Sequence, residues 1–329
     1  MHILLTGGAG YIGSHVVLNL LDLGYKITVI DDLSTGHRKL IPKEIDLITT
    51  NINDVKTIDN LIKKKSFDAL MHFAGFVKVN ESVDFPEKYY NNNTKNSEIL
   101  FQTCLRNGLN KFIFSSTAAV YGNPNKELID EKTNGIPLNP YGDSKLQTEK
   151  YLINLSKNEN LCYVILRYFN VAGADPHMRS GLISKSPTHL IKVASEAAVG
   201  KREKVIIFGN DYPTPDGTAI RDYIHVSDLA DIHVKAVEHL VTNQQSTILN
   251  CGYGKGFSVK KVLEIANAVN NKPIQTEMGS RRAGDAAMLV SNVSKLHQLL
   301  DWKPKHNDLS FIIKTAIEWE KKLMENENT

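Results

Sequence analysis

Cysteine is scarce in this sequence: Cys104, Cys162 and Cys251 are the only thiols among 329 residues. They are odd in number and lie far apart, so their spacing indicates neither a disulfide framework nor a metal-binding motif. We therefore expect reduced thiols, no metal centre and a cytoplasmic setting.

Long apolar runs and an excess of one charge are also absent. No run of about 18 apolar residues occurs, so no membrane-spanning helix is expected. The first residues, "MHILLTGG", lack the basic region of a signal peptide. Lysine and arginine number 39 and aspartate and glutamate 36, which gives a formal charge of +3. Such an even balance disfavours nucleic acid or a membrane as partner.

The first half of the sequence alternates short apolar runs with amphipathic stretches. Apolar, β-branched runs with these properties favour strands of a buried parallel sheet, and the alternation predicts an α/β fold. We expect a Rossmann-type doubly wound parallel sheet in a domain spanning residues 1–170. The expected strands are residues 2–6, 26–32, 46–51, 67–74, 110–116 and 159–169, with a first helix at 11–24.

The second half is more broken. Residues 208–223 carry two prolines and two glycines and are interpreted as a long loop, whereas 227–241, 258–269 and 308–323 show helical patterns. We expect residues 171–329 to form mainly a smaller α/β lobe, with some segments returning to the first domain. A ligand cleft is then expected at the carboxyl ends of the strands.

A glycine-rich turn, "TGGAGYIG", lies between the first strand and the first helix. Gly7, Gly10 and Gly13 would allow a tight turn and the close approach of a pyrophosphate to the helix N-terminus. Asp31, about 20 residues further on, suits the ribose hydroxyls and favours NAD over NADP. Asp32 also disfavours a 2′-phosphate, but the nearby Arg38 leaves NADP open.

Hydroxyl groups follow the strand at 110–116. Ser115, Ser116 and Thr117 lie at a strand end that would face the cofactor crevice, where hydroxyls can bind a sugar or relay a proton. Serine and threonine are also common turn formers, so the pattern alone has a purely structural alternative.

The stretch "NPYGDSK" places Tyr141 and Lys145 on one helix face, with Asn139 as cap and Pro140 in the first turn. Chance alone yields about one such pair in this chain, so the spacing has no weight by itself. A tyrosine base near neutrality needs its pKa lowered by about 3 units, or about 4 kcal/mol. One charge about 5 Å away supplies on the order of 3 kcal/mol, and an oxidised nicotinamide ring would add a second.

Taken together, these residues resemble the extended short-chain dehydrogenase/reductase superfamily and, along nearly the whole chain, its UDP-glucose 4-epimerase family. The second-half motifs are the more specific ones. The resemblance rests on "TGGAGYIGSH", "HFAG", "FIFSSTAAVYG", "NPYGDSK", "LRYFNVAGA", "IFGNDYPTPDGTAIRDYIHVSDLA" and "RRAGD".

The resemblance implies 4-epimerisation of UDP-glucose and UDP-galactose on tightly bound NAD, through a 4-keto sugar, in a homodimer. Tyr141, as phenolate, would take the proton of the sugar 4-hydroxyl. Thr117 would bridge Tyr141 and that oxygen. Lys145 would hold the ribose and lower the pKa of the tyrosine.

The resemblance also implies two sets of binding residues. The NAD set is Gly7, Gly10, Tyr11, Ile12, Gly13, Asp31, Asp32, Asn51, Ile52, Phe73, Ala74, Gly75, Asn93, Ser115, Tyr141, Lys145 and Tyr168. The UDP-sugar set is Thr117, Tyr141, Asn170, His189, Leu190, Phe208, Arg221, Tyr223, Arg282, Asp285 and Leu289.

Some positions depart from the family pattern. Asn51 stands where an aspartate often contacts adenine, Val77 replaces a lysine found in some members, and the loop 175–187 lacks the usual acidic character. Leu289 replaces a bulky aromatic that tends to occur in members excluding N-acetyl sugars. This favours a roomier pocket that also accepts UDP-N-acetylglucosamine or UDP-N-acetylgalactosamine, unless Leu289 only fills core space.

Three rival functions remain to be compared. A nucleotide-sugar 4,6-dehydratase needs an acid and a base after the threonine, but Ala118 and Ala119 occupy those places and cannot transfer protons. A UDP-glucuronate decarboxylase is a further alternative within the superfamily. A non-catalytic NAD-binding sensor is the alternative from another class, and the intact Tyr141, Lys145 and Thr117 argue against it.

Overall fold

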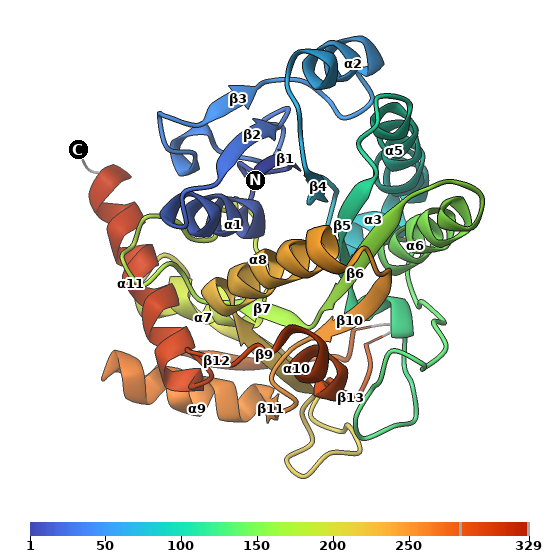
Figure 1. The fold of residues 1–329 in the computed structure, drawn as a ribbon. Helices are drawn as coiled ribbons and strands as arrows, with labels where there is room; N and C mark the ends of the chain where they lie inside the picture. Colours follow the sequence, from blue (N-terminus) through green and yellow to red (C-terminus); the bar gives the residue numbers. More distant parts are fainter. Residues whose placement is uncertain (283–284, 328–329) are drawn as a thin grey trace.

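The computed structural model describes residues 1–282 and 285–327. At its centre lies a seven-stranded sheet in which every neighbouring pair of strands is parallel (Figure 1). This confirms the predicted doubly wound α/β fold. In spatial order the strands are β10 (Thr247–Cys251), β6 (Cys162–Tyr168), β5 (Lys111–Thr117), β4 (Ala69–His72), β1 (His2–Thr6), β2 (Lys26–Ile30) and β3 (Asp46–Ile48).

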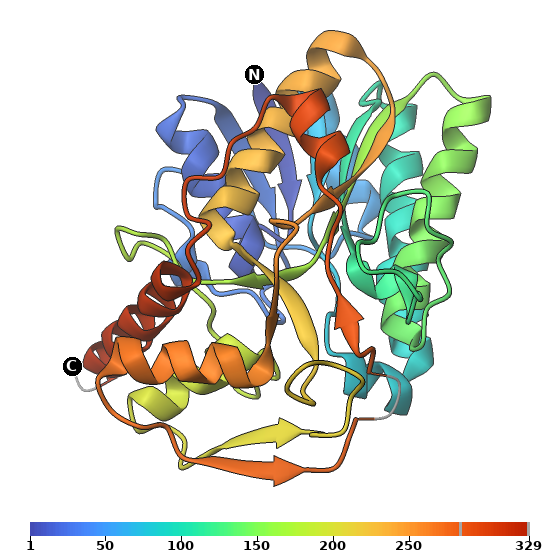
Figure 2. The same cartoon turned by 90° about the horizontal axis from the view of Figure 1, so that it is seen from below.

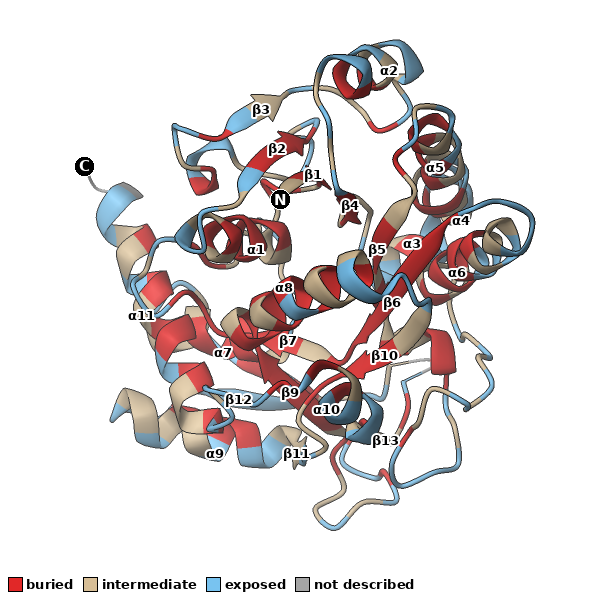
Figure 3. Ribbon diagram, viewed as in Figure 1, coloured by how far each residue is buried: buried red, intermediate tan, exposed pale blue. Residues whose placement is uncertain are grey.

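Helices cover both faces of this sheet (Figure 2). Side chains alternate between the faces along a strand, so in β1 Ile3 and Leu5 join one apolar cluster and Leu4 joins the other. Six of the seven strands are consequently buried along most of their length, whereas the edge strand β3 has no buried residue (Figure 3). One face carries α1 (Tyr11–Asp22) and α8 (Val226–Asn243); the other carries α2 (Val55–Lys64), α5 (Asn96–Arg106) and α6 (Pro140–Asn158).

A second, smaller group of elements packs below the carboxyl ends of the sheet strands (Figure 2). Its apolar core includes Ile191, Tyr223, Leu263 and Ile313. The elements that follow residue 169, apart from α8 and β10, are β7 (Asn170–Ala172), α7 (Leu190–Ala198), β8 (Val205–Phe208), β9 (Ile220–His225), β11 (Gly256–Ser258), α9 (Val259–Asn270), β12 (Thr276–Gly279), β13 (Met288–Leu289), α10 (Ser294–Leu300) and α11 (Leu309–Glu327).

Short helical segments complete the chain between the sheet strands. They are the 3₁₀ helices η1 (Arg38–Leu40) and η3 (Ala118–Tyr121), the helices α3 (Val79–Asp84) and α4 (Pro86–Tyr89), and the π-helix η2 (Tyr90–Lys95). In the part of the chain that the structure describes, no helix has the length and apolar character needed to cross a membrane.

Two segments after residue 170 belong spatially to the large sheet. β10 pairs with β6, and α8 packs against α1. The division of the chain into two domains at residue 170 stays a prediction. However, because β10 and α8 join the large sheet, the two groups of elements do not correspond to two continuous stretches of sequence.

The expectation of a continuous loop over 208–223 was wrong at its end, because β9 begins at Ile220 and pairs with β7, β11 and β13. The charged residues of this strand made it difficult to recognise in the sequence. Arg221 and Asp222 are nevertheless buried, since Arg221 pairs with Asp285 and Asp222 accepts hydrogen bonds from the amides of Tyr253 and Gly254.

We predict that Phe112→Ala lowers the free energy of unfolding by about 3–5 kcal/mol, because Phe112 is fully buried in β5 and the truncation leaves a cavity. Urea denaturation followed by circular dichroism measures this change. Phe85→Ala is the matched control, since Phe85 is 61% exposed and its loss should cost no more than about 0.5 kcal/mol. Equal midpoints for the two variants would contradict the assigned core.

Candidate active site

The helix α6 places Tyr141 and Lys145 as the sequence predicted. Asn139 caps α6 by accepting the amide of Gly142 at 2.9 Å, and Pro140 occupies the first turn. Lys145 is 3% exposed, and its Nζ donates to the carbonyl of Ser115 at 2.9 Å. Its ammonium also lies 5.0 Å from the centre of the Phe114 ring. The buried cation is therefore fixed against the end of β5.

Thr117, the last residue of β5, reaches the same point. Its side chain accepts the amide of Ala119 at 3.1 Å. Burial raises the pKa of the Tyr141 phenol, and the Thr117 hydroxyl nearby opposes that rise. Burial also lowers the pKa of Lys145 to about 8, against the charge of Glu149. In the protein alone, burial therefore disfavours the phenolate form of Tyr141.

The hydroxyl cluster on β5 divides between two faces, as strand alternation requires. Ser115 lies on the same face as Thr117 and hydrogen-bonds with Tyr168. Ser116 is 2% exposed on the other face and donates to Glu149. Of the three hydroxyls, Ser116 therefore points away from the face that Ser115 and Thr117 share.

The glycine-rich loop forms the tight turn that the sequence predicted between β1 and α1. Gly7 has φ +72°, and a Cβ there would lie 2.5 Å from the amide nitrogen of Ala74. A Cβ on Gly13 would lie 2.3 Å from the carbonyl oxygen of Gly7. Gly10 caps α1 without a side-chain acceptor, so the first amides of this 12-residue helix remain available to an anion. This geometry fits a dinucleotide pyrophosphate.

Asp31 and Asp32 follow β2 at the edge of that loop. Asp31 is buried and accepts the amides of Ala9 at 2.8 Å and Leu33 at 2.9 Å, and burial raises the pKa of its carboxyl. Asn51, which stands where the family often has an aspartate, donates to Asp32 at 2.9 Å. A polar contact is therefore present at this position. Arg38 donates to the carbonyl of Ile41 at 2.8 Å.

The remaining cofactor candidates line the neighbouring strand ends. Phe73 follows β4 and donates its amide to the carbonyl of Thr6, and Ala74 comes next, beside Gly7. Gly75 lies between Asn93 and Lys145: a Cβ there would be 3.1 Å from Asn93 Oδ1 and 3.2 Å from Lys145 Nζ. Asn93 belongs to the π-helix η2, a geometry common at functional sites.

Three further cofactor candidates lie on the two faces of the sheet. Ile12, in the first turn of α1, packs partly buried against the α1 and α8 cluster, whereas Ile52 is buried in the cluster on the other face. The phenol of Tyr168 contacts His233 of α8. The cofactor candidates therefore come from the carboxyl ends of β1 to β6 and the segments that follow them, and from α1, α6 and η2.

The substrate candidates form two groups joined by β9. Asn170, His189, Leu190 and Tyr223 line one cavity together with Tyr11. The other group is Phe208, Arg221, Arg282, Asp285 and Leu289.

Ion pairing and stacking hold the second group together. Arg221 pairs with Asp285, while the Arg282 guanidinium lies 3.9 Å from the centre of the Phe208 ring. Arg221 and Tyr223 share a face of β9. Burial raises the pKa of the Tyr223 phenol, the charge of Arg221 lowers it, and the charge of Asp285 raises it. Ala283 and Gly284 of the "RRAGD" motif lie outside the described residues.

Leu289 lies in β13, partly buried, and packs against a cluster that contains Ala118, Val120 and Phe169. One member of this cluster, Ala118, directly follows Thr117. Elsewhere, the described residues contain no group of three histidine, cysteine, aspartate or glutamate side chains able to hold a metal ion.

The sequence analysis missed a buried network beneath these residues. Glu149 is fully buried and accepts from Arg167 at 2.6 Å and 3.0 Å. Arg167 also donates to the Tyr121 phenol at 3.0 Å, which donates to Asn250 at 2.6 Å. Glu149 is four residues after Lys145 and eight after Tyr141, so the repeated four-residue spacing on one helix face was a signal that could have identified it.

We predict that Glu149→Ala lowers the free energy of unfolding by about 3–5 kcal/mol, because it leaves the buried Arg167 charge without its carboxylate. Glu149→Gln should lose less, since the amide oxygen still accepts one hydrogen bond. Urea denaturation of both variants provides the measurement. Glu318→Ala, which removes an exposed partner of Lys314, is the control. An Ala variant as stable as this control would refute a structural role for the pair.

The comparisons with known proteins agree with this arrangement. Residues 3–252 match the sequence model of the NAD dependent epimerase/dehydratase family. A UDP-glucose 4-epimerase of Azospirillum brasilense is 49% identical, over 98% of this chain and 92% of that protein.

Solved structures of similar proteins share the fold. The UDP-Glc/GlcNAc 4-epimerase of Campylobacter jejuni is 45% identical, with a TM-score of 0.85 over 98% of this chain and 99% of that chain. The UDP-glucose 4-epimerase of Bifidobacterium longum, solved in complex with NAD⁺ and UDP, is 33% identical, with a TM-score of 0.92 over 98% of each chain.

Proposed function

Because this chain belongs to the NAD dependent epimerase/dehydratase family, we propose that it is an enzyme that interconverts UDP-glucose and UDP-galactose by inverting the sugar at C4. The observation that carries the proposal is the meeting of Tyr141, Lys145 and Thr117 at the end of β5, beside a loop built for a dinucleotide. Full-length similarity to UDP-glucose 4-epimerases supports the same reaction.

NAD is the cofactor, and when bound it would supply a reversible acceptor for the hydride at C4 of the sugar. The glycine loop and the N-terminus of α1 would hold its diphosphate, and Asp31 would face a ribose. Asp31 and Asp32 together repel a 2′-phosphate, and the Arg38 guanidinium is engaged with a backbone carbonyl. These contacts favour NAD over NADP.

Tyr141 is the proton acceptor in this proposal, and Thr117 the hydroxyl that connects it to the sugar oxygen. Burial raises the pKa of the tyrosine, so the phenolate needs positive charge nearby. Lys145 provides one such charge from the same helix face, and the oxidised nicotinamide ring provides the other. The proton therefore moves only in the assembled complex, where both charges meet the phenol.

The UDP group would be held by the cavity and by β9. Arg221 and Arg282 offer planar guanidinium groups that bind diphosphate oxygens in pairs. Asn170, His189, Leu190 and Tyr223 line the cavity next to them. A dehydratase is not favoured, because Ala118 and Ala119 supply no acid or base after Thr117.

The homodimeric state and the cytoplasmic setting also belong to this proposal. The first rests on the family resemblance and the second on the three cysteines, which are free and buried and suit a reducing compartment. Size-exclusion chromatography with light scattering measures the oligomeric state directly.

We predict that the purified protein interconverts UDP-galactose and UDP-glucose without added NAD and without net oxidation, as resolved by NMR. Tyr141→Phe should reduce turnover about 10²- to 10⁴-fold, because the proton acceptor is lost. The variant should keep its NAD content, which excludes a loss of cofactor as the cause. Wild-type turnover by Tyr141→Phe would rule out the assigned base, and the absence of any C4 interconversion by the wild type would favour the sensor alternative.

We further propose that N-acetylated UDP-sugars are substrates, because Leu289 is smaller than an aromatic residue and packs against the cluster that contains Ala118. The Campylobacter jejuni relative is a UDP-Glc/GlcNAc 4-epimerase. Leu289→Tyr should lower kcat/KM for UDP-N-acetylglucosamine about 10- to 100-fold and leave that for UDP-glucose within a few-fold, as pocket narrowing selects by size. Leu289→Met is the volume-matched control. A wild-type enzyme inactive on both N-acetyl sugars would refute this substrate range.

A further inference from the structure

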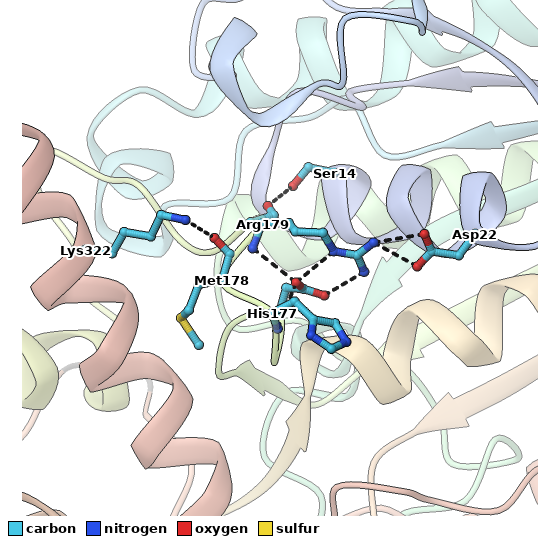
Figure 4. Close-up of polar contacts among 8 residues, drawn as sticks. Ser14, Asp22, His177, Met178, Arg179 and Lys322 are labelled. Atoms are coloured by element: carbon cyan, nitrogen blue, oxygen red, sulfur yellow. Dashed lines mark hydrogen bonds and ion pairs between the residues drawn. The ribbon is translucent and has the colours of Figure 1, made fainter.

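A strap of chain, Gly173–Leu182, follows β7 and passes between α1 and α11 (Figure 4). It includes most of the loop to which the sequence analysis gave no role. Its first contact with α1 is the Tyr11 phenol, which donates to the carbonyl of Gly173 at 2.6 Å. A second is the buried pair of hydroxyls of Ser14 and Ser180, 2.6 Å apart. Both partners on α1 lie in its first two turns, the end that faces the dinucleotide loop.

Arg179 provides the third contact, at the other end of α1 (Figure 4). Its Nη1 donates to both carboxylate oxygens of Asp22 at 2.9 Å. Its Nε and Nη2 donate to the two oxygens of Asp175 at 3.0 Å each. Asp175 is buried and also accepts the amide of His177, so the carboxylate shapes the strap from within. One guanidinium thus joins the strap to itself and to α1.

The far side of the strap is attached to α11. Lys322 donates to the carbonyl of Met178 at 2.7 Å, and the indole of Trp319 donates to the carbonyl of Leu182 at 3.3 Å. Gly181 lies flat on the Trp319 ring, since a Cβ there would be 2.5 Å from its carbons. The strap therefore links the helix of the dinucleotide site to the last helix of the chain.

The strap also borders the candidate substrate cavity. Gly173 and Leu182 line it together with Tyr11 and Trp319, and the candidate substrate residues Asn170 and His189 lie on the same wall. A cofactor seated on the first turn of α1 would lie beside the strap, because Tyr11 and Ser14 of α1 both contact it. Segments held by few contacts open locally at a rate that each added contact reduces.

We propose that Arg179 is a positioning residue for the cofactor, which slows the release of NAD by fastening the strap to α1 through Asp22. This inference rests on the proposed function, because it takes NAD as the resident cofactor. Arg179 touches neither the substrate nor the reacting atoms in this role. It acts through the strap, so its loss should change how long NAD stays bound and leave the chemistry of the filled enzyme intact.

The test loads the purified enzyme with isotopically labelled NAD and follows its exchange against unlabelled NAD by chromatography and mass spectrometry. Arg179→Ala should release NAD on the order of tenfold faster, because it removes charge-assisted hydrogen bonds to two carboxylates. Asp22→Asn should accelerate release about threefold, since only the link to α1 is weakened. Arg179→Lys, which keeps the charge but not the fork, should fall between the wild type and Arg179→Ala.

Two features of the chain separate this role from general stability. Asp22 ends α1, where a negative charge opposes the helix dipole, so Asp22→Asn should not weaken the helix itself. Arg202→Ala is the matched control: the Arg202 side chain is 38% exposed and pairs with Glu196, while that of Arg179 is 36% exposed. The control should release NAD at the wild-type rate. High salt should accelerate release from the wild type more than from Arg179→Ala.

The outcomes are distinguishable. Wild-type release rates in both Arg179→Ala and Asp22→Asn would overturn the inference while leaving the proposed epimerase intact. Equal acceleration in Arg202→Ala would show a general loss of stability and would also overturn it. If Arg179→Ala fails to fold, Asp22→Asn decides the question. A wild-type protein that neither retains NAD nor interconverts the sugars would refute the proposed function, and the inference with it.

Discussion

The buried charge of Lys145 is the constraint on which the rest of this site depends. An ammonium removed from water costs several kcal/mol unless polar or charged groups surround it. Here the Ser115 carbonyl accepts from it, the Phe114 ring faces it, and the Glu149 carboxylate acts on it from the next helical turn. The lowered pKa of Lys145 shows that burial still exceeds these compensations. The helix that carries the charge must therefore be firmly anchored.

That anchor is the network around Glu149. The carboxylate ties α6 to β6 through Arg167 and to β5 through Ser116, and Tyr121 extends the connection to Asn250 on β10. All three strands end beside the catalytic candidates. Tyr141, Lys145 and Glu149 follow one another on a single face of α6. The contacts of Glu149 therefore also fix the position and orientation of Tyr141 relative to Thr117. Rigid support of this kind is what a proton transfer within hydrogen-bond reach requires.

Much of this could be predicted from the sequence, and the reason is physical proximity along the chain. The glycine turn, the Asn139 cap, the Tyr141 and Lys145 spacing and the apolar strands each depend on residues within about one or two turns of one another. The NAD family and the epimerase resemblance followed from such local motifs, and the comparisons confirmed both. The roles given to individual site residues stay predictions.

What escaped prediction depends on pairs that are distant in sequence. Residues 208–223 were interpreted as a loop because of their prolines and glycines, so strand β9 at their end was missed. Its Arg221 and Asp222 are buried because Asp285 and the amides of residues 253 and 254 bind them from distant parts of the chain. The contact between Ser116 and Glu149, 33 positions apart, was also not predicted, because the partner of a buried hydroxyl depends on which helix covers its face of the sheet. Arg179 and Asp22 lie 157 positions apart, so no local sequence pattern predicted the contact between the strap and α1.

The sequence by itself determined the elements, the dinucleotide turn and the chemical identity of the catalytic candidates, since these are properties of short stretches and of their side chains. Only the tertiary structure decided which charges are buried together, which face each hydroxyl takes, and how the second half closes on α1. Those outcomes depend on desolvation and on partners brought together by packing. Packing is set by the whole chain at once and by no single segment of it.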